Sequence, residues 1–140
     1  MDIGCGKGAT LVMATELNFR EIIGIEISKE LYDSCKQNIE KLKSKDKITI
    51  FNCDATEYHF ADNPNVVFFG NPFGDKILET VVSNMEKCLL STFYVIYLNA
   101  FHHKVFEDRG YKLLLSMSSD ENIFRYYSHG IRVYVKEVKP

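Results

Sequence analysis

The chain begins with a glycine-rich stretch, DIGCGKG at residues 2–8, which restricts the fold more than any other feature of the sequence. Glycine permits positive φ angles and a close approach of the backbone to a ligand. The apolar run that follows predicts a helix, whose first turn offers unpaired backbone N–H groups. A short strand, a glycine turn and a helix in this order predict an α/β fold whose turn contacts a ligand.

The rest of the chain alternates β-branched or aromatic runs with amphipathic segments. We expect further strands at residues 20–28, 47–51, 65–70, 91–100, 111–117 and 131–138, and helices at 9–17, 29–42, 75–89 and 102–110. Strands that alternate with helices predict a parallel sheet with right-handed connections. The last two strands have no helical pattern between them, which favours an antiparallel hairpin at the end of the sheet. We expect a single domain over residues 1–140.

Side-chain patterns predict local features of these elements. Ser28 is expected to cap the second helix, and the first helix is expected to be buried because it is mostly apolar. Ile77 is assigned to the apolar face of the helix at 75–89. In the last strand, apolar residues alternate with Arg132, Tyr134 and Lys136, so we expect these three side chains to face water.

The first strand is expected to be central in such a sheet, yet only a few residues precede the glycines. We expect Met1 to be an internal residue of a longer protein, and an unusually short strand is the alternative. A segment on the N-terminal side could also cover the ligand.

Composition excludes several function classes. The net charge of −2 argues against binding to duplex DNA, and the longest apolar stretch, residues 93–98, is too short to span a membrane. The N-terminus lacks the basic start and apolar core of a signal peptide. Four scattered cysteines without a C-x-x-C pair indicate reduced thiols in a cytoplasmic protein with no metal site.

Acidic residues at strand ends narrow the choice of ligand. Glu26 ends the second strand, where a carboxylate can accept hydrogen bonds from both hydroxyls of a ribose. Asp54 follows the third strand and can accept from an adenine amino group, while the Ala55 backbone N–H faces a ring nitrogen. The glycine spacing is G-x-G-x-G, but Ala9 after Gly8 also satisfies a weaker dinucleotide-binding pattern.

The fourth strand distinguishes these possibilities, because the sequence FFGNPFG at residues 68–74 places Asn-Pro-Phe at its carboxyl end. Here the chain resembles the class I S-adenosylmethionine-dependent methyltransferases over nearly its whole length. DIGCGKG resembles their first motif, GIEIS the ribose-binding strand end, and CDA the adenine contact. NPF resembles the (N/D)-P-P-(Y/F) motif of amino-group methyltransferases, without the second proline.

This resemblance implies a three-layer α/β/α Rossmann-like fold with strand order 3-2-1-4-5-7-6, and S-adenosylmethionine as the cofactor. It implies a cofactor site formed by Asp2, Gly4, Cys5, Gly6, Gly8, Glu26, Ile27, Asp54, Ala55 and Asn71. Within this site Ile27 would pack on the adenine, with a role in the core as the alternative, while Cys5 and Cys53 are small filling residues rather than nucleophiles. The methyl group would move by direct in-line displacement, without a metal.

The resemblance also implies the catalytic residues Asn71, Pro72 and Phe73. The Asn71 side chain and the Pro72 carbonyl would accept the N–H hydrogens of the acceptor, which favours nitrogen as the methylated atom. Phe73 would stack on the acceptor or on the forming cation. A simple turn is the structural alternative, since Asn-Pro and Pro-Phe-Gly are common turn sequences.

Other features leave their roles open. His102 and His103 follow the fifth strand and are candidates for binding the acceptor or taking up a proton. The aromatic segment 123–127, with Arg125, Tyr126 and Tyr127, is a candidate wall of an acceptor pocket or a packed loop. The acceptor itself is open among small molecules, protein side chains and RNA, as is the oligomeric state.

Two other functions compete with methyl transfer. An NAD-dependent oxidoreductase could use Gly4, Gly6, Ala9 and Glu26, but it leaves Asp54 and the NPF sequence unexplained. A catalytically silent domain that binds a nucleoside or a protein partner is the second alternative.

Overall fold

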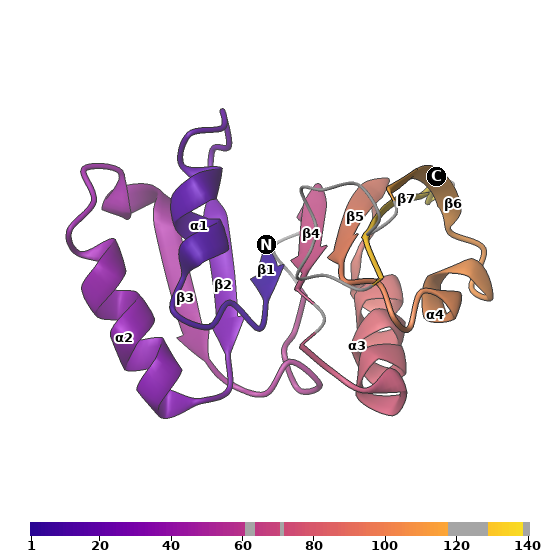
Figure 1. Cartoon of the computed structure of the whole chain (residues 1–140), viewed down its shortest axis with the longest axis horizontal. Coiled ribbons are helices and arrows are strands. Elements are labelled where there is room, and N and C mark those ends of the chain that lie inside the picture. The colour runs from indigo at the N-terminus through magenta and orange to yellow at the C-terminus, as the bar shows by residue number, and fades with distance from the viewer. Residues whose placement is uncertain (61–63, 71, 118–128, 139–140) are drawn as a thin grey trace. The chain divides into compact units, whose positions relative to one another are not determined.

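The computed structural model describes residues 1–60, 64–70, 72–117 and 129–138. In this part of the chain, seven strands form a sheet in the order β3-β2-β1-β4-β5-β7-β6 (Figure 1). The strands are β1 (Asp2–Ile3), β2 (Ile22–Glu26), β3 (Ile48–Asn52), β4 (Val66–Phe69), β5 (Phe93–Leu98), β6 (Lys112–Met117) and β7 (Ile131–Lys136). The helices are α1 (Ala9–Ala14), α2 (Lys29–Ile39), α3 (Asp75–Cys88) and α4 (Lys104–Glu107), with a short 3₁₀ turn at Lys45–Lys47.

The sheet has the predicted topology. Strands β1, β2 and β3 pair in parallel, and so do β4 and β5. Strand β7 is antiparallel to both β5 and β6, between which it lies. The predicted strand order, with its antiparallel last strand, is therefore confirmed. The chain divides into two compact units, residues 1–58 and 59–140, which are described separately below; the single domain over 1–140 stays a prediction.

Unit 1 places its two helices against β2 and β3. Its buried core joins Cys5 and Leu11 to Ile22 of the sheet and to Cys35 and Ile39 of α2. The backbones pack closely here: a Cβ atom on Gly24 would lie 2.7 Å from Leu11 Cδ1. Glycine in the middle of β2 is therefore required by helix–sheet packing.

Both helices of unit 1 end earlier than predicted, and α2 ends at Ile39 rather than at residue 42. Ser28 caps α2 as expected, since its Oγ accepts a hydrogen bond from the Leu31 backbone N–H at 3.3 Å. Helix α1, however, ends at Ala14 rather than at residue 17. The Thr15 hydroxyl donates to the Val12 carbonyl at 2.7 Å, and tight turns follow. The expectation of a buried helix was also wrong, because Met13 is 71% exposed.

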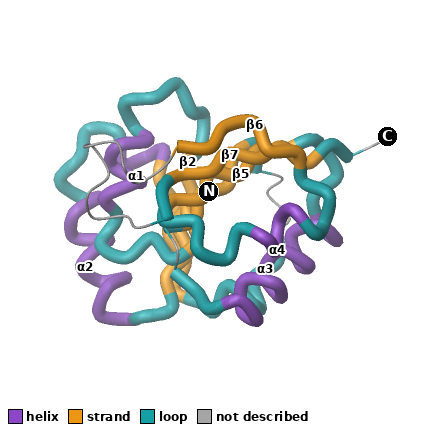
Figure 2. The backbone as a smooth tube through the Cα atoms, turned by 45° about the vertical axis from the view of Figure 1, so that its right-hand side comes forward, coloured by secondary structure: helices purple, strands orange, loops and turns teal. Residues whose placement is uncertain are grey.

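Unit 2 has an aromatic core beneath two helices. Helices α3 and α4 lie side by side (Figure 2). Phe106 of α4 stacks on Tyr134 of β7, with ring centroids 5.3 Å apart, and it also contacts Phe69, Tyr97 and Tyr111. Several of these rings are fully buried, so this contact network forms the centre of the unit.

Two exposure predictions for unit 2 were wrong. Tyr134 was expected to face water but is fully buried. Arg132 and Lys136 on the same face are half-buried. Arg132 forms an ion pair with Glu107 of α4, and Lys136 forms one with Glu86 of α3 and donates to the Arg109 carbonyl after α4. Alternation separates the two faces of a strand but does not say which face the helices cover. Ile77, which was assigned to the apolar face of α3, is 47% exposed.

None of the helices in the described ranges has both the length and the apolar character needed to cross a lipid bilayer.

Candidate functional site

The glycine turn between β1 and α1 has the backbone geometry that the sequence predicts. Gly4, Gly6 and Gly8 have φ angles of 78°, 54° and 88°, values that favour glycine. The backbone N–H groups of Gly4 and Cys5 both donate to the Ile25 carbonyl at 2.9 Å, which ties the turn to β2. The turn is therefore fixed by backbone hydrogen bonds without any ligand.

Gly6 and Gly8 have different surroundings. A Cβ on Gly8 would lie 2.7 Å from Cys35 Sγ, so that residue is pressed against helix α2. A Cβ on Gly6 would meet no atom within 4 Å. The backbone at Gly6 thus faces open space, into which a ligand can approach it closely.

Glu26 is the central side chain of unit 1. Its carboxylate is buried, with 7% of the residue exposed. Oε2 accepts a hydrogen bond from the Gly6 backbone N–H and Oε1 from the Ser28 backbone N–H, both at 2.8 Å. Because a carboxylate oxygen has two lone pairs, each oxygen retains an acceptor position for a hydroxyl donor. The residue predicted to bind ribose therefore also connects the glycine turn to the start of α2.

The end of β3 lies beside the end of β2 in the same register. Asn52 pairs with Glu26 across the two strands, and its side-chain amide donates to the carbonyls of Glu26 and Ile27 at 2.9 and 3.1 Å. Ile27 is 65% exposed, which excludes the alternative that it belongs to the core. An apolar side chain next to the buried carboxylate can cover one face of a planar ligand.

Asp54 follows β3 and has a local hydrogen-bonding arrangement. Its Oδ1 accepts from both the backbone N–H and the hydroxyl of Thr56 at 2.8 Å. These two hydrogen bonds lower the pKa of the Asp54 carboxyl below its usual value. Ala55 is buried. Asp54 is thus held as a carboxylate, whose two oxygens act only as hydrogen-bond acceptors.

Asp2 is the second buried carboxyl of unit 1, with 4% of the residue exposed. Burial raises its pKa from 3.8 to about 7, and a hydrogen bond with Thr10 opposes this shift. The negative charge of Glu26 adds to the rise, so the two carboxyl groups interact. Asp2 is therefore partly protonated near neutral pH.

The cysteines near the site have the environment of packing residues. Cys5 and Cys35 are buried in the core cluster of unit 1. Burial raises the pKa of the Cys5 thiol far above that of a free cysteine, which makes its nucleophilic thiolate form rare. In the described ranges, no group of three or more histidine, cysteine, aspartate or glutamate side chains could hold a metal ion.

The residues predicted to bind the acceptor belong to unit 2. Asn71 lies outside the described residues, whereas Pro72 is exposed and Phe73 half-buried after the end of β4. Because β4 and β5 are parallel, their carboxyl ends share one edge of this unit. His102 and His103 follow β5 at that edge. The segment 123–127 also lies outside the described residues.

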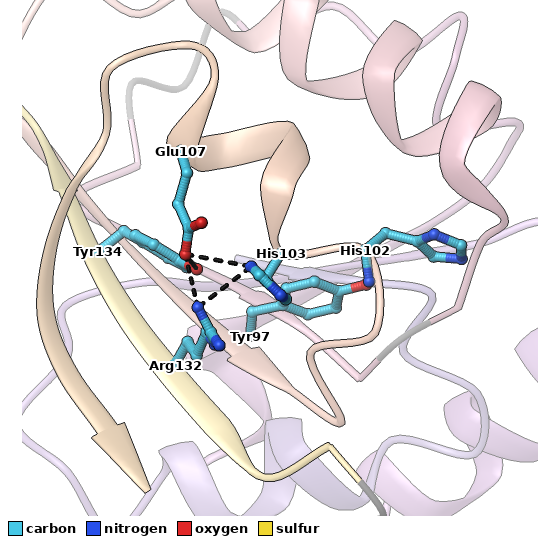
Figure 3. Close-up of polar contacts among 6 residues, drawn as sticks. All are labelled: Tyr97, His102, His103, Glu107, Arg132 and Tyr134. Atoms are coloured by element: carbon cyan, nitrogen blue, oxygen red, sulfur yellow. Dashed lines mark hydrogen bonds and ion pairs between the residues drawn. The ribbon is translucent and has the colours of Figure 1, made fainter.

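His102 and His103 have different environments (Figure 3). The His103 Nδ1 lies 3.1 Å from Glu107 Oε1 and 3.1 Å from Arg132 Nη1, so its ring is engaged in an ion-pair cluster. The His102 ring points away from that cluster, while its backbone N–H donates to the Tyr97 hydroxyl at 3.3 Å. Of the two histidines, His102 has the side chain directed away from these internal partners.

Three residues that shape the candidate site were not identified from the sequence. Asn52 and Thr56 orient the ends of β2 and β3, yet a single asparagine or threonine after a strand carries little signal. Asn99 has a positive φ of 53°. The predicted strand at 91–100 included it, although asparagine tolerates this conformation and could have indicated a tight turn there.

The sequence comparisons identify a family. A family model described as a methyltransferase domain matches residues 1–92. A histone-lysine N-methyltransferase specific for H3 lysine-79, from Dictyostelium discoideum, is 35% identical over 101 residues. That match covers 61% of this chain, which spans 5% of the length of the relative.

Solved structures support the same fold. A magnesium protoporphyrin IX methyltransferase from Synechocystis PCC 6803 with bound S-adenosylmethionine has a TM-score of 0.70 at 15% identity, covering 99% of this chain and 68% of that one. An S-adenosylmethionine-dependent methyltransferase assigned in Methanococcus maripaludis has a TM-score of 0.74 at 15% identity, covering 99% and 77% of the two chains.

At the level of the family, these matches confirm the predicted S-adenosylmethionine-dependent methyltransferase and its cofactor. None of the relatives named above supports the oxidoreductase or the silent-domain alternative. The roles of individual site residues and the cytoplasmic location stay predictions. The chain belongs to the methyltransferase domain family, and its fold is that of the class I S-adenosylmethionine-dependent methyltransferases.

Proposed function

We propose that this chain binds S-adenosylmethionine through the strand ends of unit 1 and transfers its methyl group to a nitrogen atom of an acceptor. The observation that carries the cofactor part is the buried Glu26 carboxylate, held by the Gly6 and Ser28 N–H groups beside open space at Gly6. When bound, S-adenosylmethionine supplies a methyl group on a cationic sulfur that leaves as a neutral thioether.

The residues of unit 1 fit this cofactor. Glu26 would accept hydrogen bonds from the two ribose hydroxyls with its remaining lone pairs. Asp54 would accept from the adenine amino group, the Ala55 N–H would face a ring nitrogen, and the exposed Ile27 side chain would cover the adenine. The glycine turn, with Asp2 and Cys5, would line the ribose and methionine part.

Nitrogen is the proposed acceptor atom for two reasons. The Asn71-Pro72-Phe73 sequence follows β4, where the family's amino-group enzymes orient the acceptor. The Dictyostelium relative is by its name an N-methyltransferase acting on lysine. In this chain the Asn71 side chain and the Pro72 carbonyl would accept the acceptor's N–H hydrogens, and Phe73 would pack against it. Orientation of the nitrogen lone pair is the main catalytic contribution required.

The test is a screen of candidate acceptors with this protein. Turnover is measured as the release of S-adenosylhomocysteine, and the products are identified by mass spectrometry. We expect N-methylated products, and calorimetry should show that Asn71→Ala keeps its affinity for S-adenosylmethionine while losing transfer. Products methylated on oxygen or carbon alone would refute the nitrogen assignment. Calorimetric binding that is unchanged in Glu26→Gln would refute the cofactor site.

A further inference from the structure

The loop that follows β5 carries an unusual aromatic group. Phe101 is 57% exposed, although it is a large apolar residue. The rings of His102 and His129 contact it at centroid distances of 4.7 and 4.6 Å, nearly perpendicular to it at 83° and 75°. A phenyl ring with solvent-exposed surface therefore contacts two imidazoles, His102 and His129, that are 27 residues apart in the sequence.

Two hydrogen bonds, one of them to the Asn99 side chain, hold the segments that carry these two histidines together. The Asn99 N–H donates to the Gly130 carbonyl at 2.7 Å, and the His129 N–H donates to Asn99 Oδ1 at 3.2 Å. The Phe101 N–H donates to the Asn99 carbonyl at 2.7 Å. Asn99 adopts a left-handed conformation with φ 53° to make this arrangement possible. The loop conformation is therefore defined before any acceptor binds.

A polar cluster joins α4, the helix after the loop, to β7 (Figure 3). Glu107 Oε1 accepts hydrogen bonds from Arg132 Nη1 at 2.5 Å and from the Tyr134 hydroxyl at 3.2 Å, and it contacts His103 Nδ1 at 3.1 Å. These contacts join α4 to β7. Helix α4 begins directly after the loop, so these contacts hold the helix that follows the loop against β7.

The position of this group suggests its use. It lies at the carboxyl end of β5, and Pro72 and Phe73 follow the carboxyl end of the neighbouring parallel strand β4. In open α/β sheets, ligands bind outside the carboxyl ends of the strands. The ring contacts of Phe101 are with His102 and His129, whereas the aromatic core of unit 2 joins Phe106 to Tyr97 and Tyr134.

The chemistry of the group suits an alkylammonium side chain. The face of a phenyl ring attracts a protonated amine. Methyl transfer needs the nitrogen lone pair, so the ammonium proton must leave first, and a neutral imidazole offers one nitrogen that can accept it. We propose that Phe101, flanked by His102 and His129, recognises the amine-bearing side chain of a lysine residue as the methyl acceptor. This inference rests on the proposed function, because it assigns the nitrogen acceptor of that reaction.

The experiment uses the whole protein with saturating S-adenosylhomocysteine, so that the cofactor site is filled. The probe is N-acetyl-lysine methylamide, titrated against the backbone amide NMR signals. We expect shifts at Phe101, His102 and His129, and an affinity about five-fold lower in Phe101→Leu, because leucine keeps the apolar contact but removes the π face. The matched control is Tyr94→Leu, an exposed aromatic residue near the opposite end of β5.

Two further probes define the result. N-acetyl-norleucine methylamide, which lacks the amino group, should cause no shifts at these amides. Cytidine tests a planar amino group: shifts from cytidine, with the lysine probe silent, would overturn the proposal. Equal affinity of the lysine probe for wild type and Phe101→Leu would also overturn it. A lysine probe that binds at Phe101 but is never N-methylated, while the acceptor screen yields other N-methylated products, would also overturn this inference; a screen without any N-methylated product would instead refute the proposed function.

Discussion

Substitution of Gly8 by alanine tests the packing of the glycine turn against helix α2. Gly8 has a φ of +88°, and a Cβ there would lie 2.7 Å from Cys35 Sγ, in a fully buried position. A left-handed alanine costs about 1–2 kcal/mol, and overpacking a core adds about 1–3 kcal/mol. We therefore expect Gly8→Ala to lower the free energy of unfolding by about 2–5 kcal/mol, measured by urea denaturation.

Gly6→Ala is the matched control for this substitution. Gly6 also has a positive φ, +54°, but a Cβ there would meet no atom within 4 Å. The loss of stability should therefore be limited to the conformational cost of about 1–2 kcal/mol. The added methyl group would occupy the open space beside the Gly6 N–H, so we expect affinity for S-adenosylmethionine to fall more than stability does.

A double mutant separates the two contributions at Gly8. Cys35→Ala removes Sγ, after which the Cys35 Cβ at 3.8 Å makes only an ordinary contact with the new methyl group. In that background, the cost of Gly8→Ala should drop to the value measured for Gly6→Ala. If Gly8→Ala costs the same with and without Cys35, or no more than Gly6→Ala, the assigned clash is refuted.

Three other substitutions test buried polar groups by chemical denaturation. Burial raises the pKa of Asp2 from 3.8 to about 7. Between these two pH values the folded state retains a proton that the unfolded state releases. The free energy of unfolding should therefore fall by up to about 4 kcal/mol as the pH rises through this range. Asp2→Asn should remove that dependence, and a wild-type profile parallel to that of the variant would contradict it. Glu26→Gln places an NH₂ group against the backbone N–H of either Gly6 or Ser28, so it should lower the free energy of unfolding by about 1–3 kcal/mol. Its control, Glu21→Gln at an exposed position, should change that free energy little. The Tyr111 hydroxyl is buried without a hydrogen bond of acceptable geometry among the described residues, so Tyr111→Phe should change stability by less than about 1 kcal/mol, and a larger loss would show that the hydroxyl has a partner.

Local chemistry made much of the fold predictable. Ser28 could be recognised as a helix cap because its type and place before an amphipathic segment define the role. The glycine turn was predictable because three closely spaced glycines after a strand permit the positive φ angles that the turn needs. The end of α1 was not predictable in this way, because the Thr15 hydroxyl competes for a backbone carbonyl in a segment that is otherwise apolar.

Burial on the last strand depends on tertiary packing. The alternation in β7 separates two faces correctly, but Arg132, Tyr134 and Lys136 lie on the helix-covered side. The polar ends of these side chains contact Glu107 and Glu86. The helix-covered face of β7 therefore contains charged side chains that form ion pairs with α3 and α4. Such pairs come from elements far apart in the sequence, and no pattern within the strand reveals them.

The site shows the same division between local and distant information. The position of Glu26 after a buried strand was enough to predict a ligand-binding carboxylate, but its bonds to the Gly6 and Ser28 N–H groups arise from the register of three separate segments. These bonds orient the carboxylate and the glycine turn together before a ligand arrives. A ribose would therefore meet acceptors already in place, and part of the entropy cost of ordering the site is incurred on folding rather than on binding. This coupling explains why one substitution at Glu26 should weaken both folding and cofactor affinity, whereas Gly6→Ala should act mainly on affinity.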